Sequence, residues 1–143
     1  MKWNTPALLE LGLRVAAIAQ FGIAALNLSL VPLLGWKEDL GRLPLLVREV
    51  FQVHLIFITV TVAIFAVLTW RFAGAMASGS DLVATWLAIA IGLFWGIRSV
   101  MQWTHYSASH WRGQASRTLA HWLLFFGYGS FAVVYLRAGF AHR

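Results

Sequence analysis

The chain has 143 residues, of which 60% are hydrophobic and 11% are charged, whereas an ordinary soluble domain has roughly 45–50% apolar and about 25% charged residues. So few charged side chains cannot cover the surface of a soluble domain, and the composition therefore excludes a soluble globular fold and predicts a protein that faces lipid. There is no cysteine, which excludes thiolate metal sites, and the net charge of +6 comes from basic residues spread between apolar stretches, with no nucleic-acid motif.

Four stretches are long enough to cross a hydrocarbon core of roughly 30 Å, which requires about 20 apolar residues in a helix. In chain order they are residues 7–34, 50–70, 82–103 and 118–137. We expect Pro32 to mark the end of the first. No internal repeat or long linker divides the chain, so residues 1–143 are expected to form a single domain.

The three connecting segments differ in character. Residues 35–49, GWKEDLGRLPLLVRE, alternate leucines with charges over too short a distance to cross a bilayer, which predicts an interfacial amphipathic segment. Residues 72–81, FAGAMASGSD, read as a small flexible loop in which Ser80 or Asp81 caps the next helix. Residues 104–117 read as a polar loop. The sequence therefore predicts an all-α, polytopic, four-transmembrane-helix bundle in a bacterial inner membrane, while the even division of basic residues leaves its orientation open.

Polar side chains inside the spans are informative, because a charged group at bilayer depth costs at least ~2.5 kcal/mol. Successive spans run in opposite directions, so the polar residues near their ends fall in the same leaflet. This common depth predicts a polar pocket in that leaflet. The candidates for this pocket are Glu49, Gln52, His54, Arg98, Gln102 and His121. Arg98 is expected to be held by an acid or by carbonyl acceptors, with Glu49 as the nearest acid. The alternative is that these residues only make interhelical hydrogen bonds or reach the headgroups.

The third span has two distinct faces. Arg98 and Gln102 are spaced i, i+4 and share a polar face, whereas small residues form a ladder on a different face. Such a ladder lets a neighbouring helix approach closely, either within the bundle or in a homo-oligomer or larger membrane complex. Its members are Ala84, Ala88, Gly92 and Gly96.

The ligand of the pocket is less constrained. A di-iron carboxylate centre is excluded because only Glu49 accompanies the histidines, and the zinc hydrolase motif H-E-x-x-H is absent. His54 and His121 are the metal ligands if the pocket holds haem b, since they offer two imidazoles at matched depth. A quinone-type or lipid-headgroup pocket built from His, Arg, Gln and Trp fits equally well.

Two segments carry a family resemblance. Residues 42–58, RLPLLVREVFQVHLIFI, and residues 93–106, LFWGIRSVMQWTHY, resemble the most distinctive stretches of a group of small, uncharacterised four-helix bacterial membrane proteins. The resemblance implies the four-span fold and supplies no catalytic residue.

The expected function is that of a small inner-membrane protein, non-catalytic or an accessory subunit, whose surroundings are the lipid bilayer. The alternative is a membrane subunit of an electron-transfer system that binds haem b or a quinone. A transporter is a third class, disfavoured because a chain of 143 residues has no room for an inverted repeat.

Overall fold

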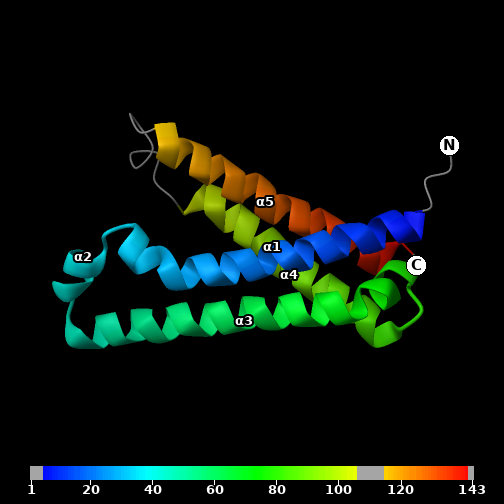
Figure 1. The fold of residues 1–143 in the computed structure, drawn as a ribbon, viewed down its shortest axis with the longest axis horizontal. Coiled ribbons are helices and arrows are strands. Elements are labelled where there is room, and N and C mark those ends of the chain that lie inside the picture. The colour runs from blue at the N-terminus through cyan, green and yellow to red at the C-terminus, as the bar shows by residue number, and fades with distance from the viewer. Residues whose placement is uncertain (1–4, 106–114, 142–143) are drawn as a thin grey trace. The chain divides into compact units, whose positions relative to one another are not determined.

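A computed structural model describes residues 5–105 and 115–141 of the chain. Within these ranges every regular element is a helix (Figure 1). In chain order they are α1 (Thr5–Leu33), α2 (Lys37–Gly41), α3 (Leu45–Ser78), α4 (Leu82–Thr104) and α5 (Ala115–Phe140).

Four of the described helices are long and apolar enough to cross a membrane. The candidate spans are Pro6–Leu33, Leu45–Ser78, Leu82–Thr104 and Thr118–Phe140, with mean hydropathies between 1.5 and 2.3. Their outer faces carry large apolar side chains, such as Phe57 and Val83, which are 73% and 75% exposed. Exposed apolar side chains on every long helix are typical of a protein surrounded by lipid. The all-α class and the four apolar helices predicted from the sequence are confirmed.

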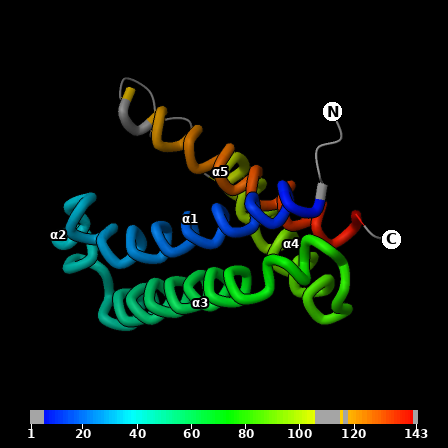
Figure 2. The backbone as a smooth tube through the Cα atoms, turned by 45° about the vertical axis from the view of Figure 1, so that its right-hand side comes forward, coloured from blue at the N-terminus to red at the C-terminus, as the bar shows by residue number. Residues whose placement is uncertain are grey.

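The chain packs as two compact units, one formed by residues 14–71 and the other by residues 1–13 together with residues 72–143. In the first, α1 and α3 run side by side, as both views show (Figures 1 and 2). The guanidinium of Arg14 lies 5.2 Å from the centre of the Trp70 ring, a cation–π contact. The second unit contains the antiparallel pair α4 and α5. The single domain expected from the sequence stays a prediction.

Helix α1 ends in a Schellman motif. The backbone N–H of Trp36 donates to the carbonyl of Val31, at 3.1 Å, and that of Gly35 donates to Pro32, at 3.3 Å. Gly35 has a φ of +67°, in the left-handed region that glycine adopts without steric cost. Pro32 thus lies in the last turn of α1, one residue before its end, as predicted. The turn leads into the short helix α2.

Helix α3 is longer than the sequence predicted at both ends. It begins at Leu45, directly after Pro44, so the last five residues of the expected interfacial segment belong to it. It continues to Ser78, and the expectation of a loop from residue 72 was wrong. Alanine is the strongest helix former, and Ala73 and Ala77 are buried, so both propensity and packing favour the helix there. Only residues 79–81 form the turn.

Helix α4 begins with the cap that the sequence predicted. The carboxylate of Asp81 accepts a hydrogen bond from the backbone N–H of Ala84, at 2.8 Å. This bond satisfies one of the first amides of the helix, which have no partner within it. Asp81 rather than Ser80 is the capping residue.

Candidate functional site

The candidate site lies along the seam between α4 and α5, where small residues let the two helices pack closely. Gly92 is one point of close approach: a Cβ atom built on it would lie 2.9 Å from Cγ of Leu136 and 3.1 Å from the Leu136 backbone N. One turn along, the corresponding atom on Gly96 would lie 3.8 Å from Cβ of Ala132. Ala84 and Ala88 are buried. The small-residue face of α4 therefore packs within the chain, one of the two uses expected for it, and its use in an oligomer or larger complex stays a prediction.

Helix α5 contributes small residues to the same seam, which the sequence reasoning missed. Gly139 packs directly on Ile89, and Gly129 lies close to Ser99, whose Oγ would be 3.6 Å from an added Cβ. Ala132 completes this set. Positions 129, 132 and 139 share one side of a helix, so the same spacing argument, applied to α5, would have found them.

A hydrogen-bonded polar cluster occupies one flank of the seam. Nη1 of Arg98 donates to Oε1 of Gln102, at 3.0 Å. Nε2 of Gln102 lies 3.0 Å from Nδ1 of His121 across the helix pair. Gln102 is only 2% exposed, whereas the other two side chains are half-buried. The structure thus brings together three of the six predicted pocket residues, Arg98, Gln102 and His121, which we call the polar cluster.

The chemistry of the cluster fixes the direction of each bond. Arginine has no acceptor, so the carbonyl oxygen of the Gln102 amide must face Arg98 and its N–H₂ group must face His121. Nδ1 of His121 therefore accepts a hydrogen bond, and the proton of the neutral ring is on Nε2. The arginine thereby sets the histidine tautomer through the intervening amide.

Aromatic rings of α4 and α5 form a stack that contacts Arg98 of the polar cluster. The Arg98 guanidinium lies 4.9 Å from the centre of the Tyr128 ring, within the range of a cation–π contact. The Tyr128 ring stacks in turn on Trp95, with centroids 5.1 Å apart and an interplanar angle of 22°. Trp95 is 2% exposed and also contacts Phe131 at 5.0 Å. Arg98 thus contacts both the Gln102 amide and an aromatic stack of Tyr128 on Trp95.

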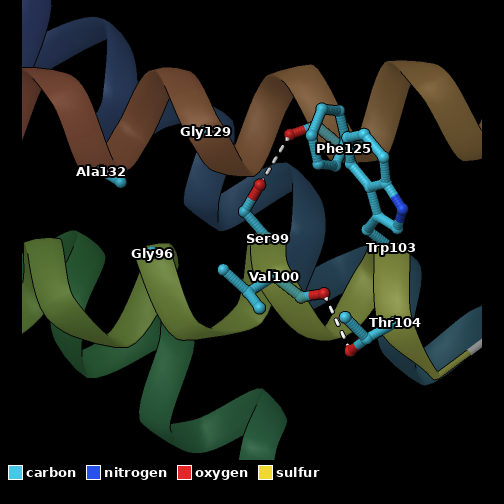
Figure 3. Close-up of a pocket in the computed structure, with 8 residues that line it drawn as sticks. All are labelled: Gly96, Ser99, Val100, Trp103, Thr104, Phe125, Gly129 and Ala132. Atoms are coloured by element: carbon cyan, nitrogen blue, oxygen red, sulfur yellow. Dashed lines mark hydrogen bonds between the residues drawn. The ribbon is translucent and has the colours of Figure 1, made fainter.

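A groove of about 430 Å³ is lined by residues of both α4 and α5. Its lining residues are Gly96, Ser99, Val100, Trp103, Thr104, Phe125, Gly129 and Ala132 (Figure 3). Both hydroxyls among them are already engaged: Ser99 Oγ donates to the Phe125 carbonyl at 3.2 Å, and Thr104 Oγ1 donates to the Val100 carbonyl at 3.1 Å. The groove therefore presents a mainly apolar surface, in contrast to the polar cluster.

The other three predicted pocket residues lie on α3, in the unit formed by residues 14–71. Glu49, Gln52 and His54 are all exposed. Their proximity to the polar cluster, including the expected ion pair of Glu49 with Arg98 and the haem site of His54 with His121, stays a prediction. Arg98 does have the carbonyl acceptor that the sequence led us to expect, and it is supplied by Gln102.

The polar cluster offers N–H donors to a ligand. Arg98 uses one N–H on Gln102, so the other N–H groups of its guanidinium suit an acceptor-bearing or anionic group. In the described part of the chain, no three His, Asp or Glu side chains are grouped closely enough to hold a metal ion. No protein-family model, curated protein or solved structure matches the chain.

Proposed function

We propose that this chain is a small multi-pass protein of the bacterial inner membrane that acts as a non-catalytic accessory subunit, with the polar cluster as its binding element. The four long apolar helices support the membrane location. The observation that carries the binding role is the cluster itself, in which hydrogen bonds join a cation, an amide and an imidazole on the mainly apolar α4–α5 pair.

The segment between the first two spans fits a location at the membrane surface. Helix α2 has a lysine and two acids over five residues, and none of its residues is buried. Trp36 directly before it is 39% exposed. Indole rings and short charged helices are favoured at the headgroup layer. We therefore propose that residues 35–44 lie in the plane of the interface, a shorter segment than the sequence predicted because α3 begins at Leu45.

A quinone is the second candidate ligand, and the hydrogen-bond directions favour it over haem. An axial imidazole needs a nitrogen lone pair directed at iron. In His121 the Nδ1 lone pair already accepts from Gln102, and Nε2 carries the proton. Haem binding through His121 therefore requires the Gln102 amide to release the ring, whereas a quinone carbonyl can accept from an N–H group of Arg98 while the Arg98–Gln102 hydrogen bond stays in place.

Three experiments test the proposal. A reporter fusion placed in α2 should report one side of the membrane, and fusions after Ser80 and at the C-terminus should both report the opposite side, because one span separates α2 from Ser80 and two separate Ser80 from the C-terminus. The chain should also stay in the membrane pellet after an alkaline wash. Gentle detergent extraction of the tagged chain should recover a complex with another polypeptide. The yield of this complex should fall for the variant Gln102→Leu but not for Ser130→Ala, which alters an exposed hydroxyl of α5. Recovery of the wild-type chain without any other polypeptide would contradict the accessory role. A Soret band or extractable quinone in the purified material would instead support the electron-transfer alternative.

A further inference from the structure

The charge of Arg98 is not balanced by its own helix pair. Residues 82–143 contain no Asp or Glu. Asp81 caps the opposite end of α4, 17 residues from Arg98, which is about 25 Å along a helix. Glu10 lies against Gly74, in the last turns of α3 that lead to that same opposite end. The partners that the described residues give Arg98 are the Gln102 amide and the Tyr128 ring, and both are uncharged.

The guanidinium keeps a free edge for another ligand. A cation–π contact covers the face of the guanidinium, whereas its N–H groups point outward in its plane. Among the residues that the structure describes, Gln102 is the only one that accepts from these N–H groups, and it takes one of the five. Among the described residues, no buried polar side-chain atom lacks a hydrogen-bond partner, so the remaining Arg98 nitrogens are accessible from outside the helix pair. Two parallel N–H groups match two oxygens of a phosphate.

The depth of the site fits the headgroup layer. A helical side chain ordinarily points toward the helix N-terminus, but Arg98 bends the other way to reach Gln102, one turn nearer to the end of α4 at Thr104. Its charge is thereby carried to the last turn of the helix. Lipid phosphates occupy the layer just outside the hydrocarbon, which long basic side chains reach in this manner.

We propose that Arg98 anchors a phosphate-binding site on the α4–α5 pair, in which Gln102 and Tyr128 hold the guanidinium so that its free edge binds the phosphate of a membrane-lipid headgroup. This inference rests on the proposed function only in placing the chain in a membrane. It goes further by naming the chemical class of the ligand. A lipid phosphate and a free phosphate share this chemistry, and the test separates the two.

The experiment uses the full chain purified in a neutral detergent. Phosphatidylglycerol should raise the midpoint temperature of unfolding and remain bound in native mass spectrometry, whereas diacylglycerol with the same acyl chains, which lacks the phosphate, should do neither. Inorganic phosphate is the third ligand: stabilisation equal to that by phosphatidylglycerol would show that free phosphate suffices, and a weaker effect would show that the lipid is the source.

Variants assign the effect to Arg98. Arg98→Gln should weaken phosphatidylglycerol binding by at least about tenfold, equivalent to ~1.4 kcal/mol, near the lower value for one charged hydrogen bond. Arg98→Lys keeps the charge but loses the two parallel N–H groups of the guanidinium, and should weaken binding to a smaller extent. Arg137→Gln, an exposed arginine in the last turn of α5, is the matched control and should bind as the wild type does.

Three results would overturn the proposal. One is wild-type binding that does not distinguish phosphatidylglycerol from diacylglycerol, which needs no variant to fold. Another is equal loss in Arg137→Gln, which would indicate diffuse attraction to basic residues. The third is a strongly non-additive loss of stability for Arg98→Gln and Glu49→Gln without any response to phosphate, which would identify Glu49 as the counter-ion. In all three cases the chain would still be found in the membrane pellet after the alkaline wash. If the proposed membrane location itself were wrong, the alkaline wash would release the chain into the supernatant.

Discussion

Gly92 is a position where one added methyl group would meet both the side chain and the backbone of the facing helix α5. In Gly92→Ala, the new Cβ would lie 2.9 Å from Cγ and Cδ2 of Leu136 and 3.1 Å from its backbone N. Carbon atoms pack best at about 3.5–4.0 Å, so the methyl is roughly 0.6–1 Å too close. The side chain of Leu136 can turn away, but its backbone N can move only if α5 moves.

The expected cost follows from two opposing contributions. Overpacking a well-packed site by one methylene group costs about 1–3 kcal/mol, while alanine is favoured over glycine inside a helix by up to about 1 kcal/mol. Gly96→Ala is the matched control, because the substitution and the helix are the same but the new methyl would meet Ala132 at 3.8 Å, an ordinary contact. The difference between the two variants therefore isolates the overpacking cost of about 1–3 kcal/mol.

The midpoint of thermal unfolding in detergent, followed by loss of the monodisperse peak in size-exclusion chromatography, measures this difference. At roughly 2–4 °C per kcal/mol for a chain of this size, Gly92→Ala should unfold several degrees below Gly96→Ala. Adding Leu136→Ala to Gly92→Ala should recover part of the loss, because it removes the two nearest carbon atoms. Equal midpoints for Gly92→Ala and Gly96→Ala would refute the close approach of α5 to Gly92.

Three further predictions concern single side chains. Gln102 is the hydrogen-bond partner of both Arg98 and His121, so Gln102→Leu should lower the free energy of unfolding by about 1–3 kcal/mol. The thermal midpoint of Gln102→Leu should lie below that of Gln102→Glu, whose carboxylate still accepts from the arginine. Gly35→Ala should lower the free energy of unfolding by about 1 kcal/mol, because residue 35 has a positive φ. Gly41→Ala is the control: residue 41 is helical and also has no neighbour within 4 Å, so its thermal midpoint should be unchanged or higher. A lower midpoint for Gly41→Ala than for Gly35→Ala would contradict the Schellman turn. Asp81→Ala should destabilise α4 by about 1 kcal/mol, measurable as faster amide hydrogen exchange in its first turn, and Asp81→Asn should retain most of the protection.

Features that depend on one helix alone were predictable from the sequence. The four spans follow from local composition and length, and the Asp81 cap follows from a preference for short acceptors before a helix. The end of α3 was wrong because Ala and Gly in residues 72–78 were interpreted as a loop, although alanine also favours a helix. Only the burial of Ala73 and Ala77 decides between the two.

The candidate site was predictable only in part, because it depends on the register between two helices. The phase of α4 placed Arg98 and Gln102 on one face, and their hydrogen bond is local. That His121 rather than another residue of α5 meets Gln102 depends on the register of the two helices, in which Gly92 packs on Leu136 and Gly139 on Ile89. Periodicity within each helix does not contain this information.

The length of α3 has a consequence for the membrane itself. Its 34 residues extend about 51 Å, against about 35 Å for the 23 residues of α4. Even at a tilt of 40°, the upper limit usually seen, α3 would cover about 39 Å along the bilayer normal, more than the roughly 30 Å of hydrocarbon. The stretch of α3 without charged residues is much shorter: residues 50–70, between Glu49 and Arg71, extend about 32 Å, close to the thickness of the hydrocarbon. The outer turns of α3 therefore extend past the hydrocarbon, and a thicker bilayer would bring the charges of Glu49 and Arg71 into it at a cost of at least ~2.5 kcal/mol each.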